Sequence, residues 1–252
     1  TVLRFGIDNL VRLGVKLVWI GVESRTGSPF GKNEGIDFPS LVKSLRDHGI
    51  GVLTSGILCL EHHDPSTMRE DIDFLIDLQP DLIQFMLLTG LPETGLYLEL
   101  KEAGLLRWDL PFEEWLGQKY LSFRHPRFSA EEAEEWLRSA FDADYRRNGS
   151  SMGRLVETAL RGVPAQRELA RRDEVFRARY EQLLEEIREY RPLLPLLARY
   201  AVNERERERI RVMERRFREV LGPGTWRDTG LGLLASAIAR TWSWRLRLFG
   251  DR

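Results

Sequence analysis

The sequence predicts an α/β fold, and three observations support this prediction. Short, mainly apolar runs recur along the first part of the chain, at residues 17–24, 51–60 and 82–88. A stretch with helical periodicity separates each run from the next. Each run also ends in polar side chains, which are Glu23 and Ser24, then Glu61, His62 and His63, then Thr89. Continuous apolar runs are typical of parallel strands that are covered on both faces, so we expect three right-handed βα units in series.

Length and composition set the outer bounds. The chain has 252 residues, 42% of them hydrophobic, which fits one α/β domain with an appendage. A formal net charge of −1 gives no overall field that would attract nucleic acid. Cys59 is the single cysteine, so this chain can build neither a disulfide framework nor a cysteine metal cluster. We find no signal-peptide pattern and expect a cytoplasmic protein. Thr1 begins inside a helix-like pattern, and we expect the chain to be a piece of a longer protein.

Start and stop signals place helices around the three strands. Helices are predicted near residues 1–14, 37–49, 64–80 and 96–103. Gly14 and Gly49 are stop residues, because glycine adopts the left-handed conformation that ends a helix. Asp37 and Asp64 can cap the helices that follow them, and Pro65 suits a first helical position. We therefore expect the strands to lie parallel and adjacent in chain order, with helices packed on one outer face.

The pattern changes at residue 105 and again at residue 129. Residues 105–128 are irregular and aromatic, and we expect a wrapping segment in which residues 118–123 can form an edge strand. From Ser129 onward the pattern is helical, and a capping box between Ser129 and Glu132 marks its start. The sequence therefore divides into residues 1–104, 105–128 and 129–252.

Glu23 and Ser24 are the first candidates for a functional site. In parallel α/β sheets, ligands bind at the carboxyl ends of the strands. A carboxylate there can accept hydrogen bonds from an ammonium group or a ribose diol, and the hydroxyl can add one more. Alternatively, Glu23 pairs with Arg25 or caps a turn. Position alone leaves both interpretations open.

The run Glu61-His62-His63-Asp64 has the composition of a metal site but the wrong spacing. Adjacent residues at a strand end point in different directions, so they rarely bind one ion together. Asp64 is already explained as a helix cap. We therefore predict no metal here and interpret His62 and His63 as pocket lining or solvent contacts. A metal hydrolase built on Glu61 and His63 is the least favoured of the possible functions.

Gln84 is a polar residue inside an otherwise apolar run. Because buried amides need hydrogen-bond partners, Gln84 is either a satisfied core amide or a group that faces the interior of a barrel. Parallel strands in register would bring five polar residues to one end of the sheet. These residues are Glu23, Ser24, Glu61, Gln84 and Thr89.

Two stretches of the helical region suggest partners. Residues 204–209 alternate glutamate and arginine, which predicts a solvated helix face with ion pairs rather than a nucleic-acid surface. The last stretch, about residues 230–249, combines leucines, tryptophans and arginines. Such a helix can lie in a membrane interface, or it can dock on the domain or on a missing partner segment. We expect docking.

From Gly21–Ser24 onward the sequence resembles the radical S-adenosylmethionine enzymes that carry a cobalamin-binding domain upstream. The fourth barrel strand of that family commonly has G-[VI]-E-S, which Gly21–Ser24 matches. The fifth strand resembles S-x-I-[IL]-G-L, and Ser55–Leu60 stands in its place. The sixth strand and its turn resemble Q-F-x-x-x-T-P-L-P-G-T-x-L-Y, with K-E-x-G further on. Gln84–Tyr97 and Lys101–Gly104 match those motifs.

This chain departs from the family pattern in three ways. The glycine of the fifth-strand motif is Cys59 here, which brings a side chain to a place where S-adenosylmethionine packs closely. In the turn after the sixth strand, Gly90 and Glu93 replace the family's proline and glycine. The C-x3-C-x2-C loop that binds the [4Fe-4S] cluster has no counterpart in this chain, and neither has the cobalamin domain.

The resemblance implies a partial (β/α)6 barrel that holds S-adenosylmethionine across its rim, with residues 1–104 supplying strands four to six. Glu23 and Ser24 would then contact the ribose or the methionyl ammonium group. The fifth-strand segment that would flank the adenine comprises Ile57, Leu58, Cys59 and Leu60. The substrate side would be lined by Gln84, Phe85 and Thr89.

The resemblance also implies a whole protein that is a B12-dependent radical enzyme, either a methyltransferase or an enzyme that rearranges C–C or C–H bonds. Its [4Fe-4S] cluster and cobalamin would be bound by the missing N-terminal half, the main partner of this chain. We expect the isolated chain to be inactive, and we expect the substrate of the whole enzyme to be a small or lipid-like molecule. The alternative is a non-catalytic assembly or binding module that kept the half-barrel.

Overall fold

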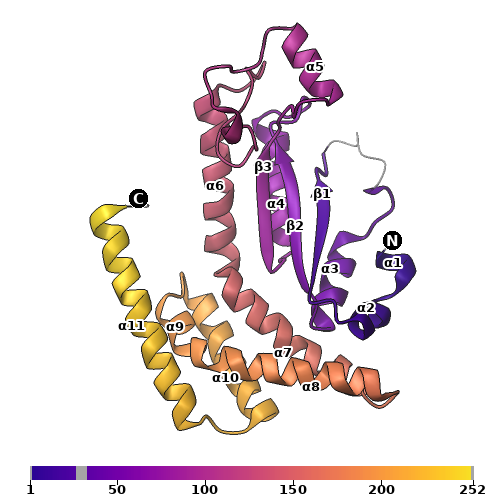
Figure 1. Ribbon diagram of the computed structural model, residues 1–252, viewed down its shortest axis with the longest axis vertical. Helices are drawn as coiled ribbons and strands as arrows, with labels where there is room; N and C mark the ends of the chain where they lie inside the picture. Colours follow the sequence, from indigo (N-terminus) through magenta and orange to yellow (C-terminus); the bar gives the residue numbers. More distant parts are fainter. Residues whose placement is uncertain (1, 27–32, 251–252) are drawn as a thin grey trace. The chain divides into compact units, whose positions relative to one another are not determined.

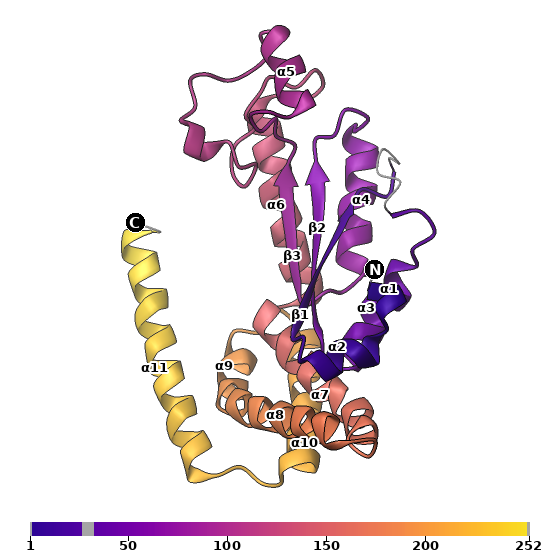
Figure 2. The ribbon, with the colours of Figure 1, turned by 45° about the vertical axis from the view of Figure 1, so that its right-hand side comes forward.

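Three strands form an open sheet in the order β1–β2–β3, and their arrows point the same way in Figures 1 and 2. The computed structural model describes residues 2–26 and 33–250. The strands are β1 (Leu17–Glu23), β2 (Gly51–Leu58) and β3 (Leu82–Leu87). β2 and β3 pair in parallel, with Ser55 opposite Gln84 and Gly56 opposite Phe85. The prediction of an α/β fold with three parallel strands in chain order is confirmed, and the sheet is not closed into a barrel by the described residues.

The helices follow the expected order. Before and between the strands lie α1 (Val2–Phe5), α2 (Ile7–Leu13), α3 (Phe38–Asp47) and α4 (Pro65–Asp77). After β3 come α5 (Gly95–Glu102), the 3-10 turn η2 (Phe112–Glu114) and α6 (Ala130–Asn148). The remainder comprises α7 (Ser151–Leu169), α8 (Glu174–Tyr190), η3 (Arg191–Leu193), α9 (Leu194–Arg199), α10 (Glu204–Leu221) and α11 (Trp226–Phe249).

The described chain divides into two compact units. The sheet unit contains residues 18–42 and 52–147, and the helical unit contains residues 1–17, 43–51 and 148–252. This division differs from the three segments expected from sequence. Residues 1–17 and 43–51 group with the C-terminal helices, while α6 groups with the sheet.

Capping residues begin the helices at the positions expected from sequence. The Asp64 side chain accepts hydrogen bonds from the amides of Ser66 and Thr67, and the Thr67 hydroxyl accepts one from the Asp64 amide. Ser129 and Glu132 form the reciprocal pair at the start of α6, with donor–acceptor distances of 2.8 and 3.1 Å. Because these bonds satisfy amides that the helix cannot, they fix where each helix starts.

One face of the sheet is covered by α4 and α6. A Cβ atom on Gly56 would lie 2.2 Å from the Leu75 side chain of α4, so a larger residue here would require the Leu75 side chain to move. Its neighbour Phe85 packs edge-on against Phe141 of α6. On the opposite face of the sheet, Trp19 is 61% exposed. The expectation that each strand is buried on both faces is therefore wrong, and we call this second surface the open face.

The wrapping segment contains no edge strand. The sequence allows one at residues 118–123, but the structure has only a single antiparallel bridge between Leu106 and Phe123. The segment instead packs along β3, where the Leu87 amide donates to the Gly117 carbonyl at 2.7 Å. Gly117 has a φ of 68°, and a Cβ atom there would lie 2.3 Å from the Leu87 oxygen. Glycine is therefore required at this contact.

The helical unit has a core of its own, built from α7, α8, α9 and α10. Its central side chains are Val156, Leu160, Leu183, Ile187, Ile210, Met213 and Phe217. The alternating charges of residues 204–209 lie mainly on the exposed face of α10, where Arg207 pairs with Glu204 at 3.0 Å. Glu206 is the exception, because it is buried and accepts hydrogen bonds from the amides of Ser150 and Val202.

In the helical unit, α7 touches the turn after α3 through two glycines. Gly162 lies on α7, and a Cβ atom added to it would lie 2.4 Å from the Gly49 Cα. Gly49 has a φ of 76°, which non-glycine residues rarely adopt. Beside this contact, the Gln166 side chain donates to the His48 carbonyl at 2.8 Å.

We predict that Gly162→Ala lowers the free energy of unfolding by about 1–3 kcal/mol, because the backbones must separate to admit the methyl group. Gly230→Ala is the matched control, since a methyl group added to Gly230 of α11 would meet no other part of the chain within 4 Å. Alanine there should be neutral or stabilise by up to about 1 kcal/mol. Urea unfolding of both variants tests this contact, and equal stability of the two would contradict it.

Candidate functional site

A hollow of about 350 Å³ lies on the open face, toward the carboxyl ends of the strands. All three strands and the residues just after β3 contribute to it. The lining residues are Trp19, Gly21, Glu23, Ser55, Gly56, Ile57, Met86, Leu87, Leu88 and Thr89. Carboxyl ends of parallel strands are where α/β folds place ligands, so this hollow is the candidate site.

Polar groups in the hollow are few and come from different strands. Among the described residues that line it, Glu23 alone carries a charge. The Trp19 indole donates to the Ser55 hydroxyl at 3.0 Å and so links β1 to β2 across the open face. Ile57 and Met86 add apolar surface. An apolar hollow with a few placed polar groups is typical of small-molecule sites.

The end of β1 holds Glu23 in a strained conformation. Glu23 has a φ of 65°, in the left-handed region that costs a non-glycine residue about 1–3 kcal/mol. The Asn33 side chain donates to the carbonyls of Gly21 and Val22, at 3.1 and 2.8 Å, and so fixes the backbone just before it. Strain of this kind persists only where the surroundings impose it, and it is common at functional sites.

Thr89 anchors the wrapping segment at the other side of the hollow. Its hydroxyl donates to the Trp115 carbonyl at 2.7 Å. It also shares a 2.7 Å hydrogen bond with the Ser122 hydroxyl. Thr89 therefore has a structural role beside its place in the lining.

Beneath the site, the buried carboxylate of Asp71 joins three chain segments. One oxygen accepts from the amides of Arg25 and Thr26, both at 2.9 Å. The other lies 3.0 Å from His63 Nε2. Because His63 Nδ1 accepts from the Leu60 amide at 3.1 Å, the proton of a neutral ring sits on Nε2 and is donated to Asp71.

Several donors keep Asp71 ionised. Burial acts to raise its pKa, but hydrogen bonds from His63, Ser24 and the Thr26 and Arg25 amides outweigh it, so the pKa lies below its usual value. A lowered pKa in the folded state stabilises the fold above the ordinary carboxyl pKa, and this contribution is lost as the pH falls through the folded-state pKa. Asp71 therefore stabilises the sheet unit at neutral pH.

Neither histidine lines the hollow. The expectation of pocket lining or solvent contact is therefore wrong for His63, whereas His62 keeps partial contact with solvent. His63 is fully buried, and His62 is half-buried with Nε2 3.4 Å from the hydroxyls of Ser24 and Thr26. His62, His63 and Asp71 are close enough together to hold a metal ion. Both ring nitrogens of His63 and both oxygens of Asp71 already make hydrogen bonds, however. We interpret the group as a structural clamp.

The structure brings together some of the site residues expected from sequence and separates others. Glu23, Ile57 and Thr89 line the hollow. Ser24 faces Asp71 and His62 instead. Four further residues are buried outside the hollow, namely Leu58, Cys59, Leu60 and Phe85. Burial raises the pKa of the Cys59 thiol to about 12.

Gln84 and Glu61 also lie outside the lining. Gln84 is half-buried on the open face, opposite Ser55, and its side-chain amide has no hydrogen-bond partner among the described residues. Of the two alternatives for Gln84, the structure therefore favours the group on the open face over the satisfied core amide. Glu61 is exposed beyond the end of β2.

Sequence reasoning missed Trp19, Gly21, Ser55, Met86 and Leu88, which all line the hollow. Side chains alternate between the two faces of a strand, so counting back by twos from Glu23 leads to Gly21 and Trp19. The same count leads from Ile57 to Ser55. This signal is present in the sequence, but it identifies a site only if one face of each strand is open.

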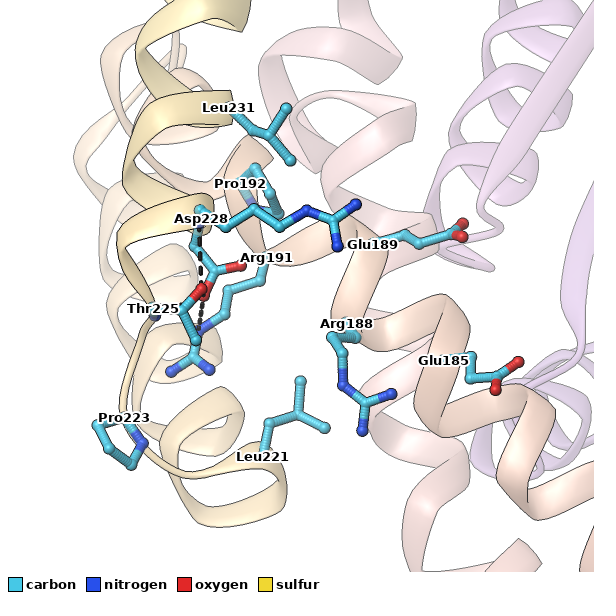
Figure 3. Close-up of a pocket in the computed structure, with 11 residues that line it drawn as sticks. Glu185, Arg188, Glu189, Arg191, Pro192, Leu221, Pro223, Thr225, Asp228 and Leu231 are labelled. Carbon is cyan, nitrogen blue, oxygen red and sulfur yellow. Dashed lines mark hydrogen bonds and ion pairs between the residues drawn. The ribbon is translucent and has the colours of Figure 1, made fainter.

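A second hollow, of about 600 Å³, lies in the helical unit between α8, η3 and the start of α11 (Figure 3). Its charges are balanced. Its arginines are Arg188, Arg191 and Arg227, and its carboxylates are Glu185, Glu189 and Asp228. Arg191 already pairs with Asp228 at 3.9 Å and donates to the Gly222 carbonyl at 2.6 Å. We therefore do not assign a ligand to it.

No protein-family model, curated protein or solved structure matches this chain. The function is therefore inferred from the residues of the sheet unit.

We predict that Asp71→Asn destabilises the protein by about 3 kcal/mol. The amide nitrogen of asparagine would face the Nε2–H group of His63. Two buried hydrogen-bond donors would then face each other without an acceptor between them. Asp77→Asn is the control on the same helix, because Asp77 is exposed and its 3.3 Å pair with Arg147 contributes less than about 1 kcal/mol. Urea unfolding at neutral pH measures both changes, and a near-native Asp71→Asn variant would show that the clamp is unimportant.

Proposed function

We propose that the sheet unit is the wall of a radical S-adenosylmethionine barrel that faces S-adenosylmethionine and substrate, within a B12-dependent enzyme of that class. The observation that carries this proposal is the hollow at the carboxyl ends of β1, β2 and β3. Three residues that the resemblance assigns to cofactor or substrate line it: Glu23 from the end of β1, Ile57 from β2, and Thr89 from just after β3.

The chemistry of the hollow suits S-adenosylmethionine. The Glu23 carboxylate can accept hydrogen bonds from the ammonium group or the ribose diol of that molecule. Ile57, Met86 and Trp19 offer apolar surface to an adenine ring. When bound, S-adenosylmethionine supplies the radical chemistry of this class. Glu23 would bind and orient it, and the apolar residues would exclude water.

Backbone conformation supports the resemblance at two positions where the sequence departs from it. The family has glycine at the places of Cys59 and Glu93, and in this structure those residues have φ values of 60° and 67°. Only glycine adopts this region without strain. Turns at these two positions that favour glycine are what the resemblance leads us to expect, so the two φ values support the proposal. Because the Cys59 side chain does not line the hollow, its presence leaves the proposed site open.

The open face supports a barrel rather than a finished three-stranded sheet. Trp19 lies on this face and is largely exposed, and Gln84 has its amide there. In a barrel, residues on this side of the strands face the interior. We propose that further strands cover this face in the whole enzyme.

This chain's residues do not fit the [4Fe-4S] cluster. Cluster binding requires several thiolates, whereas Cys59 is the only cysteine, is fully buried, and has a raised pKa. The proposal therefore assigns the cluster and the cobalamin to residues outside this chain.

We predict that Glu93→Gly raises the free energy of unfolding by about 0.5–1 kcal/mol, because glycine removes the cost of a positive φ at this exposed position. Glu93→Ala is the control, since it removes the same carboxylate but keeps a Cβ atom. Thermal unfolding distinguishes the two variants. If alanine stabilises as much as glycine, charge rather than backbone strain governs this position.

The proposed site predicts weak, specific binding of S-adenosylmethionine by the chain itself. Saturation-transfer NMR with S-adenosylmethionine should detect it, and Glu23→Gln should weaken it by about tenfold or more, because a charge-assisted hydrogen bond is lost. Glu61→Gln is the matched control, since Glu61 is an exposed carboxylate near the same end of the sheet that does not line the hollow.

Two outcomes separate binding from catalysis. If Glu23→Gln and Glu61→Gln weakened the binding of S-adenosylmethionine equally, or if the wild-type chain gave no saturation transfer, the proposed site would be wrong. Binding that depends on Glu23, together with no cleavage of S-adenosylmethionine by the full-length protein after anaerobic cluster reconstitution, would favour the non-catalytic binding module instead.

A further inference from the structure

Helix α11 docks on the helical unit through its small residues. α11 meets η3 and α9, and its less exposed side carries Gly232, Ala235, Ser236, Ala239 and Ser243. A Cβ atom on Gly232 would lie 3.0 Å from the Pro192 carbonyl oxygen. Ser243 lies within hydrogen-bond distance of the Tyr200 hydroxyl, at 3.3 Å. Docking was expected from the sequence, but not through these residues.

The start of α11 is fixed in place, as Figure 3 shows. Thr225 and Asp228 form a reciprocal cap, with the Thr225 amide donating to Asp228 at 2.7 Å. Arg191 of η3 lies beside Asp228 at 3.9 Å. Leu231 then contributes to the hollow at the base of the helix. The first two turns are thus held by these hydrogen bonds and ion pairs, in addition to the contacts that later turns make with α9.

The large apolar residues of α11 point away from the docked side. Leu233, Leu234, Ile238, Trp242 and Trp244 have exposed fractions between 51% and 66%, and we call these five residues the outer face. A helix on a protein surface normally shows the opposite arrangement, with large apolar residues inward and polar residues outward. Large exposed apolar side chains gathered on one helix in this way indicate an interaction site.

The charge beside the outer face is positive. Residues 229–250 contain Arg240, Arg245 and Arg247 and no aspartate or glutamate. In the described part of the chain, none of these three arginines has a carboxylate partner. In α10, by contrast, Arg207, Arg211 and Arg215 pair with glutamates of the same helix. Three uncompensated cations therefore accompany the apolar outer face.

This combination selects one kind of partner. Two copies of α11 would bring like charges together, which opposes pairing through the outer face. An anionic bilayer surface offers apolar chains for the tryptophans and leucines, and phosphates for the arginines, whose aliphatic stems can lie along the apolar surface. No helix among residues 2–26 and 33–250 is long and apolar enough to cross a membrane. We propose that α11 lies in the interface of an anionic lipid bilayer, with its outer face toward the acyl chains.

Co-sedimentation of the full chain with vesicles tests this proposal. We expect binding to vesicles of phosphatidylcholine and phosphatidylglycerol in equal amounts, and much weaker binding to phosphatidylcholine alone. Replacing Arg240, Arg245 and Arg247 with Gln should reduce the partition coefficient on the anionic vesicles by roughly 100-fold, at about fivefold for each cation. The control replaces the paired arginines of α10, Arg207, Arg211 and Arg215, with Gln. It should bind within a few-fold of the wild type.

Both triple variants change the formal net charge from −1 to −4. Comparing them therefore separates the effect of the α11 arginines from the effect of the net charge of the whole chain. A second matched pair of variants tests the apolar contribution of the outer face. Trp244→Ser should reduce vesicle binding severalfold, whereas Trp108→Ser should not. The two tryptophans are matched in exposure, at 64% and 66%. Circular dichroism confirms that each variant is folded.

Three results would overturn the proposal. The first is no binding to anionic vesicles, and the second is an equal loss in the two triple variants. The third is a stable dimer, detected by size-exclusion chromatography with light scattering, that dissociates in the Trp244→Asp variant. That result would identify a second copy of the chain as the partner of the outer face.

Discussion

The buried carboxylate of Asp71 is the interaction on which the candidate site depends. It accepts hydrogen bonds from two backbone amides just after β1 and from the imidazole of His63 after β2. One side chain of α4 therefore positions the ends of two strands. An ion buried to this extent is tolerated only when its hydrogen-bonding capacity is filled. Glu23, the charged residue among the described lining of the hollow, is separated from these amides by Ser24 alone.

Backbone strain gathers at the same end of the sheet. Among the described residues, four non-glycine residues have positive φ, and three of them follow or end the strands: Glu23, Cys59 and Glu93. Such conformations cost free energy, so the packing around them must impose them. The clamp at Asp71 and the Asn33 side chain supply that constraint at β1. A rigid rim of this kind suits a site that must present Glu23 in one orientation.

The helical unit uses small residues for a different purpose. Gly162 allows α7 to touch the turn at Gly49, and Gly232 allows α11 to approach Pro192. In both places close backbone approach replaces the burial of large side chains. For α11 the consequence is that its tryptophans and leucines remain outside the protein core. The sheet unit therefore accounts for the proposed small-molecule site, and the helical unit for the proposed contact with lipid.

Local signals in the sequence determined the strands, the helix starts and the order of the elements. The caps at Asp64 and Ser129 act through hydrogen bonds to residues two or three positions away, so the sequence contains all the information they need. The position of Glu23 at a strand end followed in the same way. Its partnership with Ile57 and Thr89 followed only because parallel strands in register share one end.

Tertiary structure decided which side of each strand is covered. An apolar run such as residues 82–88 is compatible with burial on one face or on two, because periodicity does not show what packs above it. Only the packed structure showed that Phe85 packs against α6 and that Trp19 is exposed. It also showed that His63 contacts Asp71 and does not line the hollow. Tertiary packing also decided which face of α11 is exposed. The composition predicted a helix that docks, but the small residues that fit against Pro192 determined which face turned outward.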